Sequence, residues 1–332
     1  MNILLLGTSG QVGWELQRAL APLGQVVACD RRRADLSYPD RLVRLVEMQR
    51  PDVIVNAAAY TAVDRAEAEP QQAHLINAVA VGALAQAAQR CDALLVHYST
   101  DYVFDGRAVG RQPEDALTGP LNVYGRTKLE GERLVEASGC RHLILRTCWV
   151  YASRGHNFAK TMLRLASERE ELRIVADQFG APTSAELIAD VTAMMLLRIR
   201  NDPVLAQHGY GTYHLTADGQ TSWHEYACYI ISTAAELGMQ LSVTASRILP
   251  VASSEFVTAA VRPRNSLLDT SRLQQTFGLS LPHWMIHAQR MLHEVVPLEI
   301  AARVASSQLS AALQHMQNNH PADAAAEGSS DT

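Results

Sequence analysis

A tyrosine and a lysine four residues apart, Tyr124 and Lys128, are the pair best suited to acid–base chemistry in this chain. On a helix, side chains at this spacing lie on one face, one turn apart. An adjacent ammonium stabilises a phenolate and so lowers the phenol pKa, which is near 10 in isolation. The pair can therefore protonate a ketone oxygen while a hydride arrives at the carbon. An ordinary exposed helix pair is the alternative interpretation.

Lysine is rare in this chain, which makes the pair more informative. Of 29 basic residues only Lys128 and Lys160 are lysine, and all the others are arginine. A compact ammonium rather than a planar guanidinium therefore stands one turn after Tyr124. This choice favours the catalytic interpretation over a chance pairing.

A Ser-Thr-Asp turn supplies a further polar group. The segment from His97 to Tyr102, which contains Thr100, follows the apolar run 94–96. Residues just past the carboxyl end of a parallel strand face the ligand crevice. In that place the Thr100 hydroxyl can donate a hydrogen bond to a substrate ketone. Taken alone, such a turn is usually a cap or a loop, so its value depends on its position.

A glycine-rich loop, GTSGQVG at residues 7–13, lies between a predicted strand and a predicted helix. Gly7, Gly10 and Gly13 permit a tight turn and a close approach of the backbone. The helix start then presents free N–H groups and a positive dipole end to a pyrophosphate. The flanking strand and helix make a dinucleotide site more plausible than a turn without ligand.

The end of the second predicted strand carries two opposing signals for the cofactor. Asp30 is an acid of the kind that binds the adenine ribose of NAD, whereas Arg31 to Arg33 suit the 2′-phosphate of NADP. Guanidinium groups bind phosphate in bidentate fashion. We therefore expect NADPH, with NADH accepted to some degree, although a solvated basic turn is the alternative.

Apolar runs and helical spacing alternate through the first half of the chain. Strands are predicted at residues 3–6, 25–29, 53–56, 94–98 and 142–147, and helices at 11–21, 41–49, 74–90 and 124–138. This alternation predicts an α/β fold of the Rossmann type, a doubly wound parallel sheet. Residues 1–150 would form the dinucleotide-binding domain. Residues 151–300 would form a smaller, mixed substrate-binding part interleaved with it, and 301–332 a helical end and a disordered tail.

Composition narrows the class of protein. The chain has 332 residues, 48% of them hydrophobic, with a formal net charge of −5. A nucleic-acid binder would carry a basic surface, and no run is long enough for a membrane helix, so neither partner is expected. The five cysteines are widely spaced and the N-terminal apolar run is short, which predicts reduced thiols and a cytoplasmic location.

These motifs together resemble the extended short-chain dehydrogenase/reductases, and among them the dTDP-4-dehydrorhamnose reductase family. The resemblance covers about residues 1–295 without large gaps. It is carried by GTSGQVG (7–13), NAAAYTAVDRAE (56–67), HYSTDYVFDG (97–106), NVYGRTKLEGE (122–132), LRTCWVY (145–151), GHNFAKTML (155–163), DQFGAPTSAE (177–186), TSWHEYA (221–227) and RPRNSLLDT (262–270).

The resemblance implies roles for individual residues. Tyr124 would be the general acid, Lys128 would tune it and bind the nicotinamide ribose, and Thr100 would orient the ketone. Asp101 and Trp149 would contact the sugar nucleotide. The implied cofactor contacts are Gly7, Gly10, Gln11, Val12, Gly13, Asp30, Arg31, Asp35, Leu36, Ala59, Tyr60, Thr61 and Tyr98, together with Tyr124 and Lys128. Tyr60 stands where the family frequently has a histidine.

Some members of the family form dimers around Mg²⁺ held by glutamates, and Glu15 and Glu186 stand at matching places. Two solvated glutamates without a metal are the alternative interpretation, and the chain is expected to be a monomer or a homodimer.

The implied reaction is NADPH-dependent reduction of the 4-keto group of dTDP-4-dehydro-6-deoxy-L-mannose to dTDP-L-rhamnose, a precursor of cell-surface polysaccharide. Another nucleotide-sugar ketoreductase, a 4,6-dehydratase or an epimerase remains open, but a dehydratase would need an acidic residue after Asp101, where Tyr102 stands. A dinucleotide-binding regulatory subunit of methionine adenosyltransferase, without catalysis, also remains open.

Overall fold

Nearly continuous apolar runs form the strands of one parallel sheet, because helices cover both of its faces. The computed structural model describes residues 1–318. Within it the strand order is β10-β5-β4-β3-β1-β2, and every neighbouring pair runs parallel. The strands are β1 (Asn2–Leu6), β2 (Gln25–Cys29), β3 (Val53–Asn56), β4 (Leu94–Thr100), β5 (His142–Thr147) and β10 (Gly211–His214). The predicted α/β fold with a parallel Rossmann-type sheet is confirmed.

The strand order changes direction between β1 and β3. From β1 the chain passes to β2 on one side, and then crosses to β3, β4 and β5 on the other. Loops that leave the carboxyl ends of two such strands diverge and open a crevice between them. Gly7 follows β1 and Ala57 follows β3, so the glycine loop lies at this crevice.

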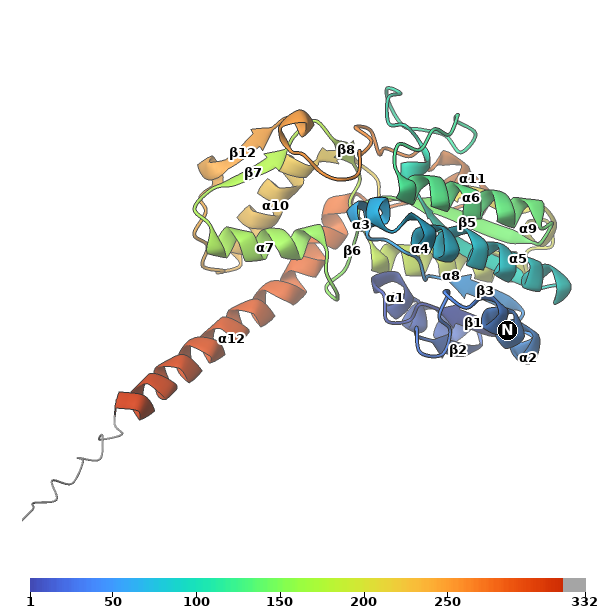
Figure 1. The fold of residues 1–332 in the computed structure, drawn as a ribbon, viewed down its shortest axis with the longest axis horizontal. Coiled ribbons are helices and arrows are strands. Elements are labelled where there is room, and N and C mark those ends of the chain that lie inside the picture. The colour runs from blue at the N-terminus through green and yellow to red at the C-terminus, as the bar shows by residue number, and fades with distance from the viewer. Residues whose placement is uncertain (319–332) are drawn as a thin grey trace, which may run out of the picture.

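Two groups of helices cover the two faces of the sheet (Figure 1). They are α1 (Gln11–Leu20) and α8 (Ala185–Asn201) on one face, and α2 (Pro39–Gln49), α5 (Ala80–Arg90) and α6 (Val123–Ala137) on the other. Leu16 and Ile188 pack with Leu5 in the first core, while Leu84 packs with Leu4 in the second. Alternate side chains of β1 thus enter opposite cores, as the pleat of a strand requires.

The helix predicted at residues 74–90 begins earlier and is interrupted. Helix α4 (Pro70–His74) passes into a π-helical turn (Leu75–Val79) before α5, and a short helix α3 (Val63–Ala68) precedes them. The wide turn brings Asn77 against α6, where a side chain on Gly131 would stand 2.1 Å from the Asn77 carbonyl oxygen. The buried Asn77 amide donates to Thr127 on α6 at 3.2 Å and accepts from the N–H of Tyr60 at 2.9 Å. These contacts fix the helix that carries the acid–base pair.

Residues after 150 contribute to both parts of the molecule. Helix α8 and strand β10 complete the sheet layer, and two short helices, α9 (Leu205–His208) and α11 (Ser271–Phe277), pack against them (Figure 1). The other elements build a smaller part beside the sheet: β6 (Val150–Tyr151), α7 (Phe158–Glu168), β7 (Leu172–Val175), β8 (Phe179–Gly180), β9 (Thr183–Ser184), β11 (Thr221–Ser222), α10 (Trp223–Glu236), β12 (Ile248–Val251) and α12 (Trp284–Asn318). Strand β7 pairs in parallel with β12, and α7 packs beside α10.

Helix α12 leaves the smaller part and projects away from the body of the molecule (Figure 1). The tail expected at the C-terminus lies, for residues 319–332, outside the described residues. Within residues 1–318, no helix combines the length and apolarity that a membrane crossing needs.

Candidate active site

A cleft of about 580 Å³ lies along the carboxyl ends of the central strands and extends to the smaller part. Most of the residues that the sequence analysis selected line it. They are Gly7, Gly10, Gln11, Val12, Arg31, Asp35, Leu36, Ala59, Thr61, Tyr98, Thr100, Asp101, Tyr124, Lys128 and Trp149. Segments far apart in the chain therefore meet in one continuous site.

Three of the residues selected as cofactor contacts do not line the cleft. Gly13 lies inside α1, where a side chain would stand 2.1 Å from the Gly7 carbonyl oxygen, so its smallness serves the packing of loop on helix. Asp30 accepts hydrogen bonds from the backbone N–H groups of Arg32 and Arg33 and thereby caps its own turn. The Tyr60 hydroxyl donates to Glu69 at 2.8 Å, outside the cleft.

The glycine loop forms a cradle at the start of α1. Gly7 has a φ of +81°, and a side chain on it would stand 2.7 Å from the backbone nitrogen of Ala58. Gly10 precedes the first turn, and no side chain caps that end of the helix. The N–H groups of the first turn therefore have no side-chain cap, and Gln11 and Val12 of this turn line the cleft, which suits an anionic group.

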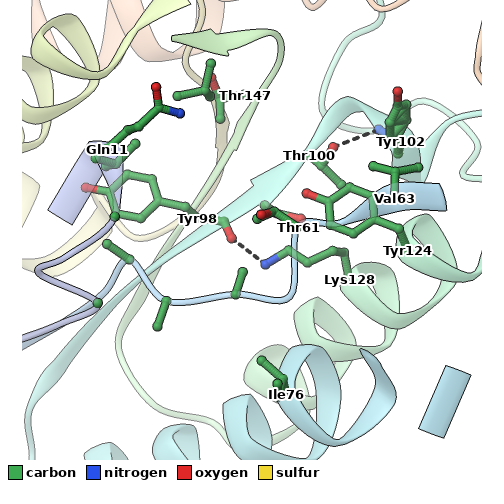
Figure 2. A pocket seen from close by; sticks show the side chains of 18 of the residues that line it. Gln11, Thr61, Val63, Ile76, Tyr98, Thr100, Tyr102, Tyr124, Lys128 and Thr147 are labelled. Atoms are coloured by element: carbon green, nitrogen blue, oxygen red, sulfur yellow. Dashed lines mark hydrogen bonds between the residues drawn. The ribbon is translucent and has the colours of Figure 1, made fainter. Parts of the chain in front are cut away.

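The acid–base pair lies at the middle of the cleft, on α6. Lys128 is 1% exposed, and its Nζ donates to the main-chain oxygen of Tyr98 at 2.6 Å. Figure 2 shows this ammonium reaching across to β4, with the Tyr124 side chain beside Thr100. Asn122 caps the helix by accepting from the N–H of Gly125 at 2.8 Å, which fixes where the first turn begins. The pair thus has a defined position before any ligand binds.

Burial shifts the proton affinities of both members of the pair. It raises the pKa of Tyr124 to about 12, against an opposing hydrogen bond with Thr100. Burial also lowers the pKa of Lys128 to about 8, against the opposing charge of Glu132. At neutral pH the phenol therefore carries its proton and the amine is largely an ammonium, which is the state needed to protonate a ketone oxygen.

Thr100 and Asp101 stand at the end of β4 and are coupled to each other. The Thr100 hydroxyl donates to Asp101 Oδ1 at 3.1 Å and accepts from the N–H of Tyr102 at 3.2 Å. Asp101 is 4% exposed, and burial raises the pKa of its carboxyl to about 6. Its Oδ2 has no hydrogen-bond partner among the described residues. A polar substrate group that enters the cleft can donate a hydrogen bond to this oxygen.

Two tryptophans close the end of the cleft nearest to the smaller part. Trp149 and Trp223 stack with ring centroids 3.5 Å apart and planes 11° apart, and both line the cleft. Trp149 has a φ of +48°, an uncommon conformation for a bulky residue. Gly180 makes room for it, because a side chain there would stand 2.6 Å from the indole. Strain held by close packing is typical of functional positions.

The opposite end of the cleft carries a positive charge at its rim. Arg31 lines the cleft and forms an ion pair with Asp35 at 3.2 Å. Arg32 instead turns to Asp30 at 3.1 Å and does not line the cleft. Of the three consecutive arginines, Arg31 is therefore the one placed to contact a ligand.

Glu15 and Glu186 lie on the neighbouring helices α1 and α8, away from the cleft. Glu15 is 3.6 Å from Arg18, and Glu186 is 3.3 Å from Arg290. Burial raises the pKa of Glu15, and the charge of Glu186 adds to the effect. Within the described part of the chain, no group of three or more acidic, histidine or cysteine side chains is arranged to hold a metal.

Sequence reasoning missed several residues of the cleft wall. They are Ser9, Ala34, Ala57, Ala58, Val63, Ile76, Ser99, Tyr102, Thr147, Cys148, Val150 and Trp223. Most belong to segments that had been selected for other residues. Trp223 differs, because it comes from a distant helix start. Its position directly after the helix-capping Ser222 is the one local signal that an aromatic side chain is held there at a defined place.

Fold and site together define the class of protein: a dinucleotide-binding oxidoreductase of the extended short-chain dehydrogenase/reductase type. Comparison with known proteins narrows this class. The family model described as RmlD substrate binding domain matches residues 1–296. The chain belongs to this family, and the predicted resemblance is confirmed.

Named relatives agree with that assignment. A dTDP-4-dehydrorhamnose reductase of Shigella flexneri is 51% identical over 299 residues, which cover 89% of this chain and 98% of the relative. One of Burkholderia thailandensis is 50% identical over 284 residues, covering 86% and 95%. A crystal structure of the dTDP-4-dehydrorhamnose reductase of Bacillus anthracis, in complex with NADP, aligns with a TM-score of 0.77 at 35% identity, covering 88% and 99%.

Proposed function

We propose that this protein reduces the 4-keto group of dTDP-4-dehydro-6-deoxy-L-mannose with NADPH, giving dTDP-L-rhamnose. The observation that carries the proposal is the meeting of Tyr124, Lys128 and Thr100 in one cleft with the glycine cradle of α1. Relatives at about half identity over nearly their whole length are named for this reaction, which supports the substrate.

The residues present fit a dinucleotide. The uncapped start of α1 and the close approach at Gly7 leave backbone N–H groups for a pyrophosphate, and Arg31 suits a 2′-phosphate at the rim. When bound, NADPH supplies the hydride that reaches the substrate C4. We infer that NADH substitutes less well, because it has no phosphate for Arg31 to contact.

The side chains then divide the remaining work. Tyr124 donates its phenolic proton to the ketone oxygen as negative charge develops there, and the Lys128 ammonium stabilises the phenolate that is left. Thr100 turns its hydroxyl from Asp101 towards the ketone and orients it. Asp101 and the Trp149–Trp223 stack border the space for the sugar nucleotide. These steps need no acidic residue next to Asp101, and the position holds Tyr102 instead.

A Tyr124→Phe variant tests the mechanism. It keeps the ring that packs edge-to-face on Tyr102 and loses only the proton donor. We expect turnover to fall by about 10²- to 10⁴-fold, while the dissociation constant for NADPH stays within about twofold. Undiminished turnover in this variant would rule out Tyr124 as the acid. NADPH binding without turnover in the unaltered protein would favour a regulatory, dinucleotide-binding role.

The glutamate pair supports a cation only at a contact between two copies of the chain. One chain supplies just two carboxylates there, and each is already close to an arginine. If Mg²⁺ bridges two copies, chelation halves the mass measured by light scattering and leaves each monomer folded. If chelation does not change the mass, the proposed Mg²⁺ bridge is wrong, and the protein is then either a monomer or a dimer that needs no metal.

A further inference from the structure

His97 lies directly behind the lysine of the acid–base pair, on strand β4, and is fully buried. Its Nε2 is 3.1 Å from Lys128 Nζ, and its Nδ1 is 3.2 Å from Nδ2 of Asn56 on β3. Asn56 is also buried, and its Oδ1 accepts a hydrogen bond from the N–H of Ala58 at 3.2 Å. A closed row of polar groups therefore runs from the ammonium to the loop after β3, which lines the cleft.

While Lys128 is an ammonium, the hydrogen-bond donors and acceptors along this row cannot all be paired. Burial, and then the Lys128 charge, hold the pKa of His97 well below its usual range, so the ring is neutral and carries one N–H. The hydrogen bond from Ala58 turns the Asn56 amide so that its nitrogen, a donor, faces Nδ1. Nδ1 must then accept, and the ring hydrogen stands on Nε2.

A hydrogen on Nε2 points at Lys128 Nζ. A neutral amine can accept it, whereas an ammonium has no lone pair to offer. We propose that His97 is a positioning residue for Lys128: the tautomer that Asn56 imposes on the ring sets how firmly Lys128 holds its proton. His97 acts through Lys128 and does not itself line the cleft.

Other groups around Lys128 keep its position while its protonation changes. The main-chain oxygen of Tyr98 accepts from Nζ at 2.6 Å in either case. Tyr124 and Glu132 lie on the same helix, and the Glu132 charge favours the ammonium. Glu132 is itself held by Arg146 of β5 at 2.7 Å, in a buried ion pair. Substitutions of His97 or Asn56 therefore change the group that faces the Lys128 ammonium and leave the Glu132–Arg146 ion pair in place.

Two substitutions relieve the conflict in different ways. His97→Gln can place an amide oxygen, an acceptor, where Nε2 faces Lys128. Asn56→Ala removes the donor that faces Nδ1, so the ring can carry its hydrogen on Nδ1 and accept from the ammonium at Nε2. Both variants should raise the pKa of Lys128, because each offers the ammonium an acceptor where Nε2 now presents a hydrogen.

The scarcity of lysine allows a direct measurement in the full-length chain. Lysine labelled with ¹³C at Cε gives two NMR signals, from Lys128 and Lys160, and Lys160→Arg assigns them. We expect Lys128 in the unaltered protein to titrate near pH 8. In His97→Gln and in Asn56→Ala the midpoint should lie about one pH unit higher, the size of one hydrogen bond to a charged group.

His214→Gln is the matched control. His214 is as buried as His97 and lies on β10, two strands from β4 in the same sheet. Burial lowers the pKa of His214 to about 3, so glutamine replaces a neutral ring and should leave the Lys128 midpoint unchanged. An equal midpoint in the unaltered protein and both test variants, or a lower one in either, would overturn the proposal. If one test variant does not fold, the other carries the measurement.

The titration needs no substrate, so it is independent of the proposed reaction. Only its consequence for turnover rests on the proposed function: the alkaline limb of the pH profile for reduction should move upward by the same amount in both variants. A raised midpoint in a protein without reductase activity would uphold the role of His97 and contradict the proposed function.

Discussion

Lys128 Nζ donates a hydrogen bond across 2.6 Å to the main-chain oxygen of Tyr98, and this contact joins α6 to the end of β4 at the acid–base pair. One buried ammonium therefore fixes the helix that carries the Tyr124 acid relative to the strand that carries Thr100. Because burial lowers the pKa of Lys128 to about 8, the charge at this junction depends on pH within the working range of an enzyme.

This pKa predicts how reduction depends on pH. In kcat/KM, which reports the free enzyme, the rate should fall as pH rises through about 8, because Lys128 loses the charge that stabilises the Tyr124 phenolate. Lys128→Met should lower the rate by about 10²-fold and remove that limb. Initial rates from pH 6.5 to 9.5 check both. A limb that persists in the variant would assign the titration to another group.

Arg31 should decide the choice between the two nicotinamide cofactors. Arg31→Ala should lower kcat/KM with NADPH by about tenfold, the effect of one lost charge-assisted contact, and leave NADH almost unaffected. Arg32→Ala is the matched control, since Arg32 pairs with Asp30 and does not line the cleft. Equal losses with both cofactors would place the 2′-phosphate elsewhere.

Trp223 should contribute to binding of the sugar nucleotide and not of the cofactor. Trp223→Ala removes one member of the stack with Trp149 and should raise KM for the keto sugar by about tenfold. The dissociation constant for NADPH, measured by fluorescence, should stay the same. Tyr229→Phe alters the same aromatic cluster outside the cleft and should change neither value. An unaffected KM in Trp223→Ala would argue that the stack is only structural.

The buried Asp101 carboxylate should lower the free energy of unfolding when it is ionised, although it contributes to substrate binding. Burial raises its carboxyl pKa from 3.8 to about 6, so the folded state holds this proton more tightly than the unfolded state. Stability of the unaltered protein is therefore lost as pH rises from about 4 to 6, by up to about 3 kcal/mol. Asp101→Asn should be more stable above pH 6, equally stable below pH 4, and weaker in turnover. Thermal unfolding across this range provides the check, and a variant less stable at pH 7 would contradict it.

Local sequence pattern was sufficient to predict the parallel sheet and most of the residues that line the cleft. Gly7, Thr100 and Tyr124 each sit beside a strand end or on a helix with a clear signal, and strand ends of a parallel sheet share one edge. Their meeting in one cleft followed from the fold class alone. Strand β10 was not predicted as part of this sheet, because a strand of four residues does not reveal which sheet it joins.

Other features depend on contacts that local pattern does not contain. Trp223 reaches Trp149 across a long stretch of chain, and Gly180 makes room for the pair. Asp30 does not line the cleft, and its carboxylate accepts hydrogen bonds from the turn that follows it, which the sequence pattern did not indicate. The interruption before α5 arises because Asn77 must meet α6. In each case a distant partner, or a competing local hydrogen bond, decides the outcome.

The most direct test of the central claim is a spectrophotometric assay at 340 nm. The purified protein is mixed with NADPH and enzymatically generated dTDP-4-keto-6-deoxy-L-hexulose, and the product is identified by NMR. We predict rapid oxidation of NADPH with dTDP-L-rhamnose as the product. NADPH that binds but is not oxidised, or a product with a different configuration at C4, would contradict the proposed reaction.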